Sequence, residues 1–297
     1  MKTNDNILII GRPKTGKSCL KGQLATRLSE TDSQVKEYKK AKNIEAVNKI
    51  TESQAIGVNP ARTSKEFDVE TIFHLEFEDG EKADLIWPDY AGEKITDIVK
   101  YRKLPKSWLP LVQESSVWML FIRLDKLKPI DNLLLRPQEN ITKLEKKKKD
   151  ENEEEFTHEI SDYAFFVELL QMLLFHRGLS TLNPVNSPVL QVVLTFWDDL
   201  EKDESSSTIV TPREELVKKC PMLVEFIESI WSSTKVSYMG LSPQGMSLAE
   251  KIDDVAKSEA IQDFADAPEE HGYIIKNNGK REDDLTYLVH HAVKLAK

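Results

Sequence analysis

Residues 6–18 read NILIIGRPKTGKS, an apolar run followed by a turn rich in glycine and lysine. The apolar part, Ile7–Ile10, has the character of a short buried strand, and residues 18–28 place leucines at helical spacing. The turn between them has the spacing G-x-x-x-x-G-K-S, with Gly11, Gly16, Lys17 and Ser18 at its fixed positions. A strand, this turn and a helix in that order predict a phosphate-binding loop.

The residue types in this turn suit the chemistry of a triphosphate. Glycines let backbone N–H groups curl around phosphate oxygens, Lys17 reaches the β- and γ-phosphates, and the Ser18 hydroxyl binds Mg²⁺. The positive N-terminus of the following helix faces the same anion. An ordinary strand-to-helix turn would explain the glycines but not Lys17 followed by Ser18. The predicted nucleotide site therefore includes Gly11, Lys14, Thr15, Gly16, Lys17, Ser18 and Cys19.

The composition argues against several other classes of function. The formal net charge of −9 at pH 7 disfavours nonspecific binding to nucleic acid or to an anionic membrane surface. The two cysteines, Cys19 and Cys220, are far apart and lack metal-site spacing, as expected in a reducing compartment. We see neither a signal peptide nor an apolar run of the roughly 20 residues that span a bilayer. These features lead us to expect a cytoplasmic protein.

Two further segments carry residues suited to a nucleotide site. Residues 56–64, IGVNPARTS, read as a loop in which Thr63 is placed to reach Mg²⁺ and the γ-phosphate. A threonine in an ordinary turn is the alternative. Residues 67–87 then read as a β-hairpin that leads into DYAGE. There Asp89 can hold Mg²⁺ through water, and Gly92 can donate its backbone N–H to the γ-phosphate.

The remaining sequence alternates apolar strand-like runs with amphipathic helical stretches, which predicts an α/β fold. We expect a single domain over residues 1–297, with a mostly parallel sheet and one antiparallel edge strand from the hairpin. Two insertions are expected, a helical one at 30–56 and a charged, flexible one at 127–160. Four later elements are also expected: one helix over 212–231, one over 247–265, a hairpin over 272–279 and a helix over 283–296.

These motifs resemble those of Ras-like GTPases related to translation factors, which are P-loop NTPases built as a three-layer sandwich. Gly11–Ser18 matches the first motif of that class, Thr63 its second and Asp89–Glu93 its third. The helical insertion, the pattern G-x-x-P-x-x-T and the motif D-x-x-G-E are similar to the bacterial double-GTPase group of conflict and defence systems. The resemblance implies a switch that binds GTP and GDP with Mg²⁺ and acts through protein partners that the sequence does not identify.

The buried strand expected at residues 189–195 ends in TFWD, where this class of GTPases has its base-reading motif, [N/T]-K-x-D. The resemblance assigns Asp198 to the N1–H and N2–H₂ groups of guanine, a contact that adenine cannot offer. Phe196 replaces the lysine whose stem covers the base, so guanine specificity stays open, and Phe196 or Trp197 is available for stacking. Helix N-capping by the Asp198–Asp199 pair is the alternative. Ser242 lies where the fifth motif approaches the base.

The groups expected to surround the phosphates and the metal are Lys17, Ser18, Thr63 and Asp89. Glu93 stands where Ras-like enzymes carry the glutamine that orients the attacking water, and its charge opposes the γ-phosphate. Arg62 is a candidate arginine finger, with a solvated loop arginine as the alternative. We expect slow GTP hydrolysis that a partner's arginine accelerates. Two other functions stay open: a nucleotide-gated interaction module without hydrolysis, and a P-loop kinase or ATPase.

Overall fold

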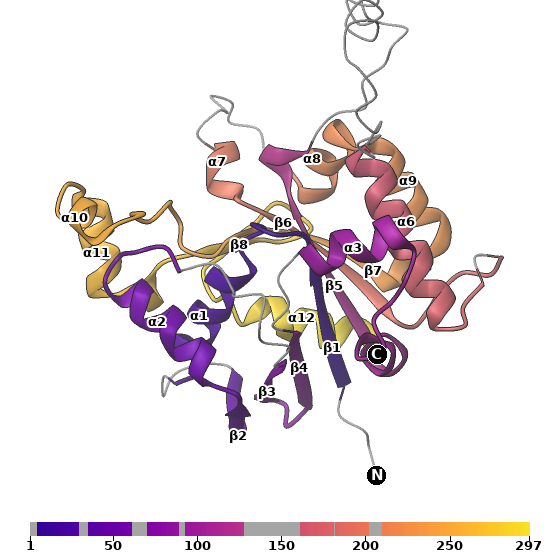
Figure 1. Cartoon of the computed structure of the whole chain (residues 1–297), viewed down its shortest axis with the longest axis horizontal. Coiled ribbons are helices and arrows are strands. Elements are labelled where there is room, and N and C mark those ends of the chain that lie inside the picture. Colours follow the sequence, from indigo (N-terminus) through magenta and orange to yellow (C-terminus); the bar gives the residue numbers. More distant parts are fainter. Residues whose placement is uncertain are drawn as a thin grey trace, which may run out of the picture.

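A mixed β-sheet forms the centre of the computed structural model, which describes residues 5–29, 35–60, 70–88, 93–127, 161–180, 182–201 and 210–297 (Figure 1). Within these residues the sheet has nine strands in the order β2-β3-β4-β1-β5-β6-β7-β8-β9. The strands are β1 (Asp5–Gly11), β2 (Val35–Lys42), β3 (Glu70–Phe77), β4 (Lys82–Pro88), β5 (Val117–Arg123), β6 (Val189–Thr195), β7 (Val236–Ser242), β8 (Tyr273–Ile275) and β9 (Arg281–Glu282).

The helices that cover this sheet come from several parts of the chain. The N-terminal half contributes α1 (Lys17–Leu28), α2 (Glu45–Ala55), α3 (Glu93–Tyr101), α4 (Trp108–Glu114) and the 3₁₀ turn η1 (Leu124–Lys126). The C-terminal half contributes α6 (Asp162–His176), α7 (Trp197–Glu201), α8 (Pro212–Lys219), α9 (Pro221–Ile230), η3 (Ser233–Lys235), α10 (Ile252–Val255), α11 (Glu259–Asp266), η4 (Pro268–Glu270) and α12 (Tyr287–Ala296).

The five central strands, β4, β1, β5, β6 and β7, are all parallel. Parallel neighbours need long crossover connections, so helices pack on both faces and the strands are mostly apolar. The sequence VLQVVLT of β6 is buried at every residue. Because these strands point the same way, their carboxyl ends meet at one edge of the sheet, and the predicted phosphate-binding loop lies at that edge.

Two apolar cores flank the sheet and confirm the α/β sandwich. Alternate residues of β1 point to opposite faces, so Leu8 and Ile10 belong to one core while Ile7 and Ile9 belong to the other. The first core contains side chains of α3, α4, α6, α8 and α9, and the second contains side chains of α1 and α12. The result is a layer of helices, the sheet and a second layer of helices, as Figure 1 shows.

Antiparallel strands flank the parallel centre on both sides, whereas the sequence predicted one antiparallel edge strand. The hairpin is confirmed as β3 and β4, and β2 adds a further antiparallel strand outside it. At the other end β8 is antiparallel to β7, and β9 to β8, which confirms a hairpin near the C-terminus. These additional strands are short or polar, and therefore carried a weaker signal in the sequence than the buried strands.

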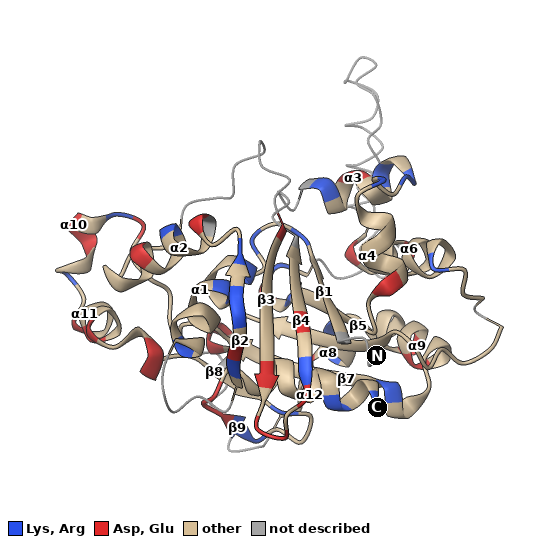
Figure 2. Cartoon of the chain, turned by 90° about the horizontal axis from the view of Figure 1, so that it is seen from below, with Lys and Arg blue, Asp and Glu red and all other residues tan. Residues whose placement is uncertain are grey.

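The expectation that the insertion at residues 30–56 is helical was wrong for its first half. Val35–Lys42 forms the edge strand β2, and only Glu45–Ala55 is a helix, α2. Lysines are common on exposed edge strands because their charge discourages pairing with another chain, and Figure 2 shows them along β2. The same lysines suggested an exposed helix in the sequence. The charged insertion lies outside the described residues from position 128 to 160.

Three C-terminal expectations also needed correction. The helix expected over 212–231 is two helices, α8 and α9, because Pro221 cannot continue α8 and instead begins α9. The helix expected over 247–265 is reduced to the short α10 and α11, and the last helix starts at Tyr287. Among the described residues no helix combines the length and apolar character needed to cross a membrane.

Candidate nucleotide-binding site

The turn between β1 and α1 has the backbone geometry of a tight anion-binding loop. Gly11 has no room for a side chain, because a Cβ atom there would lie 2.9 Å from the Cβ of Phe121 on the neighbouring strand. Gly16 adopts φ 72° and ψ 4° immediately before α1 begins, a left-handed conformation that glycine adopts without strain. Lys14 also has a positive φ, 60°, where a side chain costs energy. The loop is therefore held in a shape that the glycines make possible.

Lys17 folds its ammonium group back over this loop. Its Nζ donates to the carbonyl oxygens of Gly11 at 2.9 Å and Arg12 at 2.6 Å, and to the hydroxyl of Thr15 at 2.9 Å. Thr15 is buried and donates its own hydroxyl to the Arg12 carbonyl at 3.0 Å. Burial lowers the pKa of Lys17 from 10.5 to about 7. A phosphate group at this position would restore the charge, because an anion favours the ammonium form.

The other predicted residues of the loop lie where α1 begins. Ser18 is in the first turn of α1, directly after Lys17, and is partly buried. Cys19 follows it, and its backbone carbonyl accepts a hydrogen bond from Gln54 of α2 at 3.0 Å. Burial raises the pKa of the Cys19 thiol to about 11, so this cysteine is an unreactive packing residue. Its expected contribution to nucleotide binding is through its backbone alone.

Asp198 and Ser242 come together although they lie on different elements. The Ser242 hydroxyl, at the end of β7, donates to Oδ1 of Asp198 in α7 at 2.5 Å, and both side chains are buried. Asp198 is inside the first turn of α7, after Trp197, so the alternative role as an N-cap was wrong. The two residues predicted to approach the base therefore meet at the carboxyl ends of β6 and β7.

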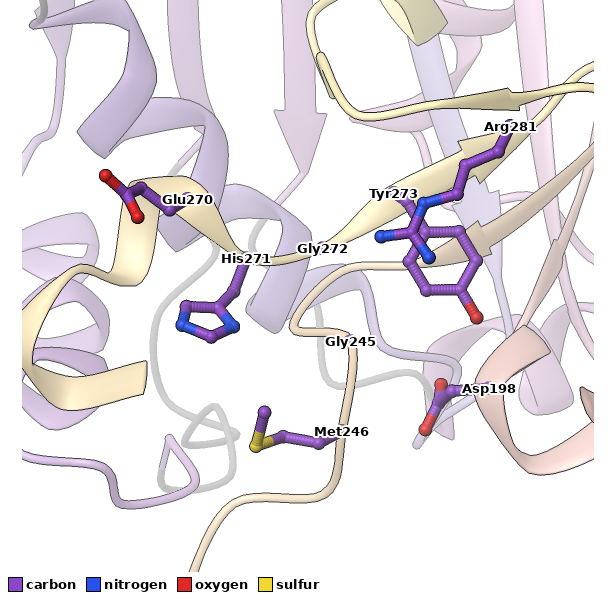
Figure 3. Close-up of a pocket in the computed structure, with 8 residues that line it drawn as sticks. All are labelled: Asp198, Gly245, Met246, Glu270, His271, Gly272, Tyr273 and Arg281. Carbon is purple, nitrogen blue, oxygen red and sulfur yellow. The ribbon is translucent and has the colours of Figure 1, made fainter. Parts of the chain in front are cut away.

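A pocket of about 400 Å³ opens beside Asp198 (Figure 3). Figure 3 shows Asp198 and Tyr273 on one side of this pocket, with Met246 and His271 on the other. The guanidinium of Arg281 lies 4.0 Å from the centre of the Tyr273 ring, a cation–π contact. The remaining wall consists of Gly245, Glu270 and Gly272. The lining thus combines the carboxylates of Asp198 and Glu270 with the guanidinium of Arg281.

Trp197 and Phe196, the two candidates for stacking, have different surroundings. Trp197 is buried, and a Cβ atom on Gly240 would lie 2.6 Å from its ring, so it packs into the sheet. Phe196 is only partly buried and lies close to Gly16, where a Cβ atom would be 3.6 Å from its ring. Phe196 therefore remains as the stacking candidate, next to the phosphate-binding loop.

Three arginines at this site were not identified from the sequence. Arg12 pairs with Asp162 at the start of α6 and lies 4.6 Å from the ring centre of Phe165, which ties the loop to that helix. Arg27 of α1 is buried and donates to the carbonyl oxygen of His271, in the pocket wall, at 2.6 Å. The third, Arg123, ends β5. The sequence offered one indication for Arg123, its position at the end of a buried strand, where charged residues often face ligands.

Most of the other residues predicted for the metal, the γ-phosphate and catalysis lie in segments that the structure does not describe. Arg62, Thr63, Asp89 and Gly92 lie outside the described residues. Glu93 is the first residue of α3, although its side chain is not described. Within the described residues no cluster of three or more His, Cys, Asp or Glu side chains forms a metal site. The roles assigned to these five residues stay predictions.

Comparison with known proteins places this arrangement in a family. The family model Double-GTPase 1 matches residues 8–292. No curated protein sequence matches the chain. Similar solved structures include sup35 complexed with GDP, at 18% identity with a TM-score of 0.35 over 82% of this chain and 38% of that one.

The GTPase-like domain of S. cerevisiae Ski7, bound to GDP and inorganic phosphate, is similar at 13% identity with a TM-score of 0.36. This match covers 81% of the chain and 43% of the Ski7 structure, so the chain spans less than half the length of either protein. The family match extends from the first strand to the last helix and includes the phosphate-binding loop, Asp198 and Ser242. The chain belongs to the Double-GTPase 1 family.

Proposed function

We propose that the protein is a Mg²⁺-dependent switch that binds GTP and GDP, hydrolyses GTP slowly and acts through protein partners. The observation that carries this proposal is the contact between Asp198 and Ser242 beside the pocket, at the same sheet edge as the Lys17 loop. These positions support the assignment of phosphate binding and base recognition to neighbouring parts of one sheet edge. That arrangement also supports treating residues 1–297 as one GTPase domain.

In the proposed mechanism the loop binds the phosphates and Asp198 reads the base. Lys17 exchanges its contacts with the Gly11 and Arg12 carbonyls for phosphate oxygens. Ser242 holds Oδ1 of Asp198, which orients the carboxylate for the two N–H groups on the edge of guanine. Two hydrogen bonds to a charged acceptor, partly shielded from water, discriminate strongly against adenine.

The donor set suits Mg²⁺, which prefers hard oxygen ligands. Ser18, at the start of α1, provides a hydroxyl beside the phosphates, and Thr63 and Asp89 are proposed to complete the set. When bound, the ion neutralises charge on the β- and γ-phosphates during hydrolysis. We assign the orientation of the attacking water to Glu93, and a charge-stabilising role to Arg62. The negative charge of Glu93 near the γ-phosphate is the reason for expecting slow turnover.

The wider role follows the family resemblance. We propose that the nucleotide state controls binding to protein partners, within a bacterial conflict or defence system. A cytoplasmic location is consistent with the two cysteines, Cys19 and Cys220, both of which are free thiols.

The substitution Asp198→Asn tests this proposal with a compensating ligand. Its amide oxygen can still accept from Ser242, while its amide nitrogen becomes a donor that suits the O2 carbonyl of xanthine. We expect the wild type to bind GTP over ATP and XTP, and the variant to lose GTP affinity by roughly 100-fold and to prefer XTP.

The measurement is a nucleotide titration with Mg²⁺, followed by release of inorganic phosphate. An unchanged base preference in the Asp198→Asn variant would contradict the assignment of Asp198. A wild-type preference for ATP would point to an ATPase or kinase instead. Tight GTP binding without phosphate release would point to a nucleotide-gated module that does not hydrolyse GTP.

A further inference from the structure

Phe196 has a backbone conformation that a phenylalanine rarely adopts. Its φ is 60°, in the left-handed region, at the point where β6 ends and α7 begins. A bulky side chain there costs about 1 kcal/mol or more, and most chains place glycine, asparagine or aspartate at such a position. Strained residues persist when the surrounding structure or the function requires the side chain. This strain makes the ring of Phe196 a candidate for a role at the site.

Arg123 covers one face of this ring from the neighbouring strand. Its guanidinium carbon lies 3.5 Å from the ring centre, close enough for parallel stacking. Asp125 holds the guanidinium with two hydrogen bonds, from Nε at 2.7 Å and from Nη2 at 3.0 Å. The third nitrogen, Nη1, donates to the carbonyl oxygen of Lys14 at 3.4 Å. The stacked pair is thus fixed from two directions.

The Arg123–Phe196 pair joins the phosphate-binding loop to the turn that leads from β6 into α7. On one side it contacts the loop, through Arg123 to Lys14 and through the ring to Gly16. On the other side Phe196 is two residues from Asp198, which lines the pocket. In the proposed binding mode, with the phosphates on the loop and the base at Asp198, the ribose and the near edge of the base lie beside this pair.

We propose that Arg123 and Phe196 form a composite stacking platform for the ribose and base, in place of the lysine missing from the base-reading motif. This inference rests on the proposed function of the site. Phe196 makes the contact with the nucleotide, and Arg123 is a positioning residue that holds the ring and polarises it. Since every base has a flat π face, the platform contributes affinity without selecting guanine, and selection stays with Asp198.

The substitution Phe196→Asn removes the ring but keeps the backbone conformation, because asparagine tolerates a left-handed φ. By isothermal titration, we expect this variant to bind GDP and ADP each about tenfold more weakly than the wild type. Tripolyphosphate, which has no base or ribose, should bind both proteins equally. Introduced into the wild type, Arg123→Ala should weaken GDP binding relative to tripolyphosphate binding by about threefold. Introduced into the Phe196→Asn variant, it should cause no additional loss, because Arg123 acts through the ring.

The matched control is Phe175→Asn, which removes a 76% exposed phenylalanine from the end of α6. It should leave all three affinities unchanged. If Phe196→Asn lowers tripolyphosphate affinity as much as GDP affinity, the ring only supports the loop and the proposal is overturned. Unchanged GDP affinity, or additive effects of the two substitutions, would overturn it as well.

The same titrations separate this inference from the proposed function. A wild type that binds ADP as well as GDP, with both weakened by Phe196→Asn, would refute guanine reading by Asp198 but support the platform. A wild type that binds tripolyphosphate but neither nucleotide would refute both.

Discussion

The protonation of Lys17 predicts that nucleotide affinity falls as the pH rises. Burial lowers the pKa of Lys17 to about 7, so above pH 7 the side chain is mostly neutral until a phosphate binds. Bound phosphates favour the ammonium form and raise that pKa again. Binding above pH 7 must therefore take up a proton, and each further unit of pH makes this uptake less favourable. The predicted direction is weaker binding at higher pH.

The magnitude follows from the fraction of nucleotide-free protein in which Lys17 is protonated, because only that form binds without taking up a proton. With a pKa of about 7 in the empty protein, GDP affinity should fall roughly 16-fold between pH 7 and pH 8.5. At pH 8 the binding of one GDP should take up about 0.9 protons, because that fraction of the lysine is neutral. Over the same range the ordinary lysine pKa of 10.5 would leave the affinity almost constant.

The assay is isothermal titration with GDP in the presence of a chelator, so that Mg²⁺ does not contribute to the pH dependence. Titrations at pH 8 in two buffers with different heats of ionisation report the number of protons taken up. Lys17→Arg is the matched control, because an arginine stays charged and should give a flat profile. A flat profile for the wild type, or no proton uptake at pH 8, would refute the reasoning.

Three further predictions concern residues around the site. Gly16→Ala and Gly80→Ala both place a side chain at a positive φ, so each should cost about 1 kcal/mol in thermal unfolding, but only Gly16→Ala should weaken GDP binding. Gly240→Val would displace the Trp197 ring, because a Cβ atom at position 240 would lie 2.6 Å from it. We expect the free energy of unfolding to fall by about 1–3 kcal/mol and GDP binding to weaken. A normal GDP titration would contradict this. Arg27→Met removes hydrogen bonds to the carbonyl oxygens of His271 and Asp283, both 2.6 Å long, and should lower the free energy of unfolding in urea by about 3 kcal/mol; a loss below 1 kcal/mol would disagree.

The position of α3 gives a structural reason to expect coupling between the nucleotide and other surfaces. α3 begins at Glu93, after the predicted γ-phosphate motif, and its buried face belongs to the same core as α6. α6 in turn is tied to the phosphate-binding loop by the Arg12–Asp162 pair. α6 thus contacts two parts of the predicted nucleotide site, α3 and the loop at Arg12.

Local patterns in the sequence were sufficient for the phosphate-binding loop and the buried strands. The loop depends on residues within thirteen positions of one another, and few turns other than a phosphate-binding loop require both its glycines and its lysine. Strands such as β5 and β6 are continuous apolar runs, which a buried parallel strand requires. The hairpin of β3 and β4 was also predictable, because its turn and both strands are adjacent in sequence.

Only the tertiary structure decided how distant residues meet at the site. The contact between Asp198 and Ser242 spans 44 positions, and Arg123 reaches Phe196 from a different strand. The edge strand β2 is polar and lysine-rich, and such a sequence suits an exposed helix equally well until its partner β3 is known. Strand order brings these groups together, and that order is a property of the whole sheet. The physical reason is that periodicity reports which face of an element is buried, whereas the identity of the neighbour depends on how all the elements pack.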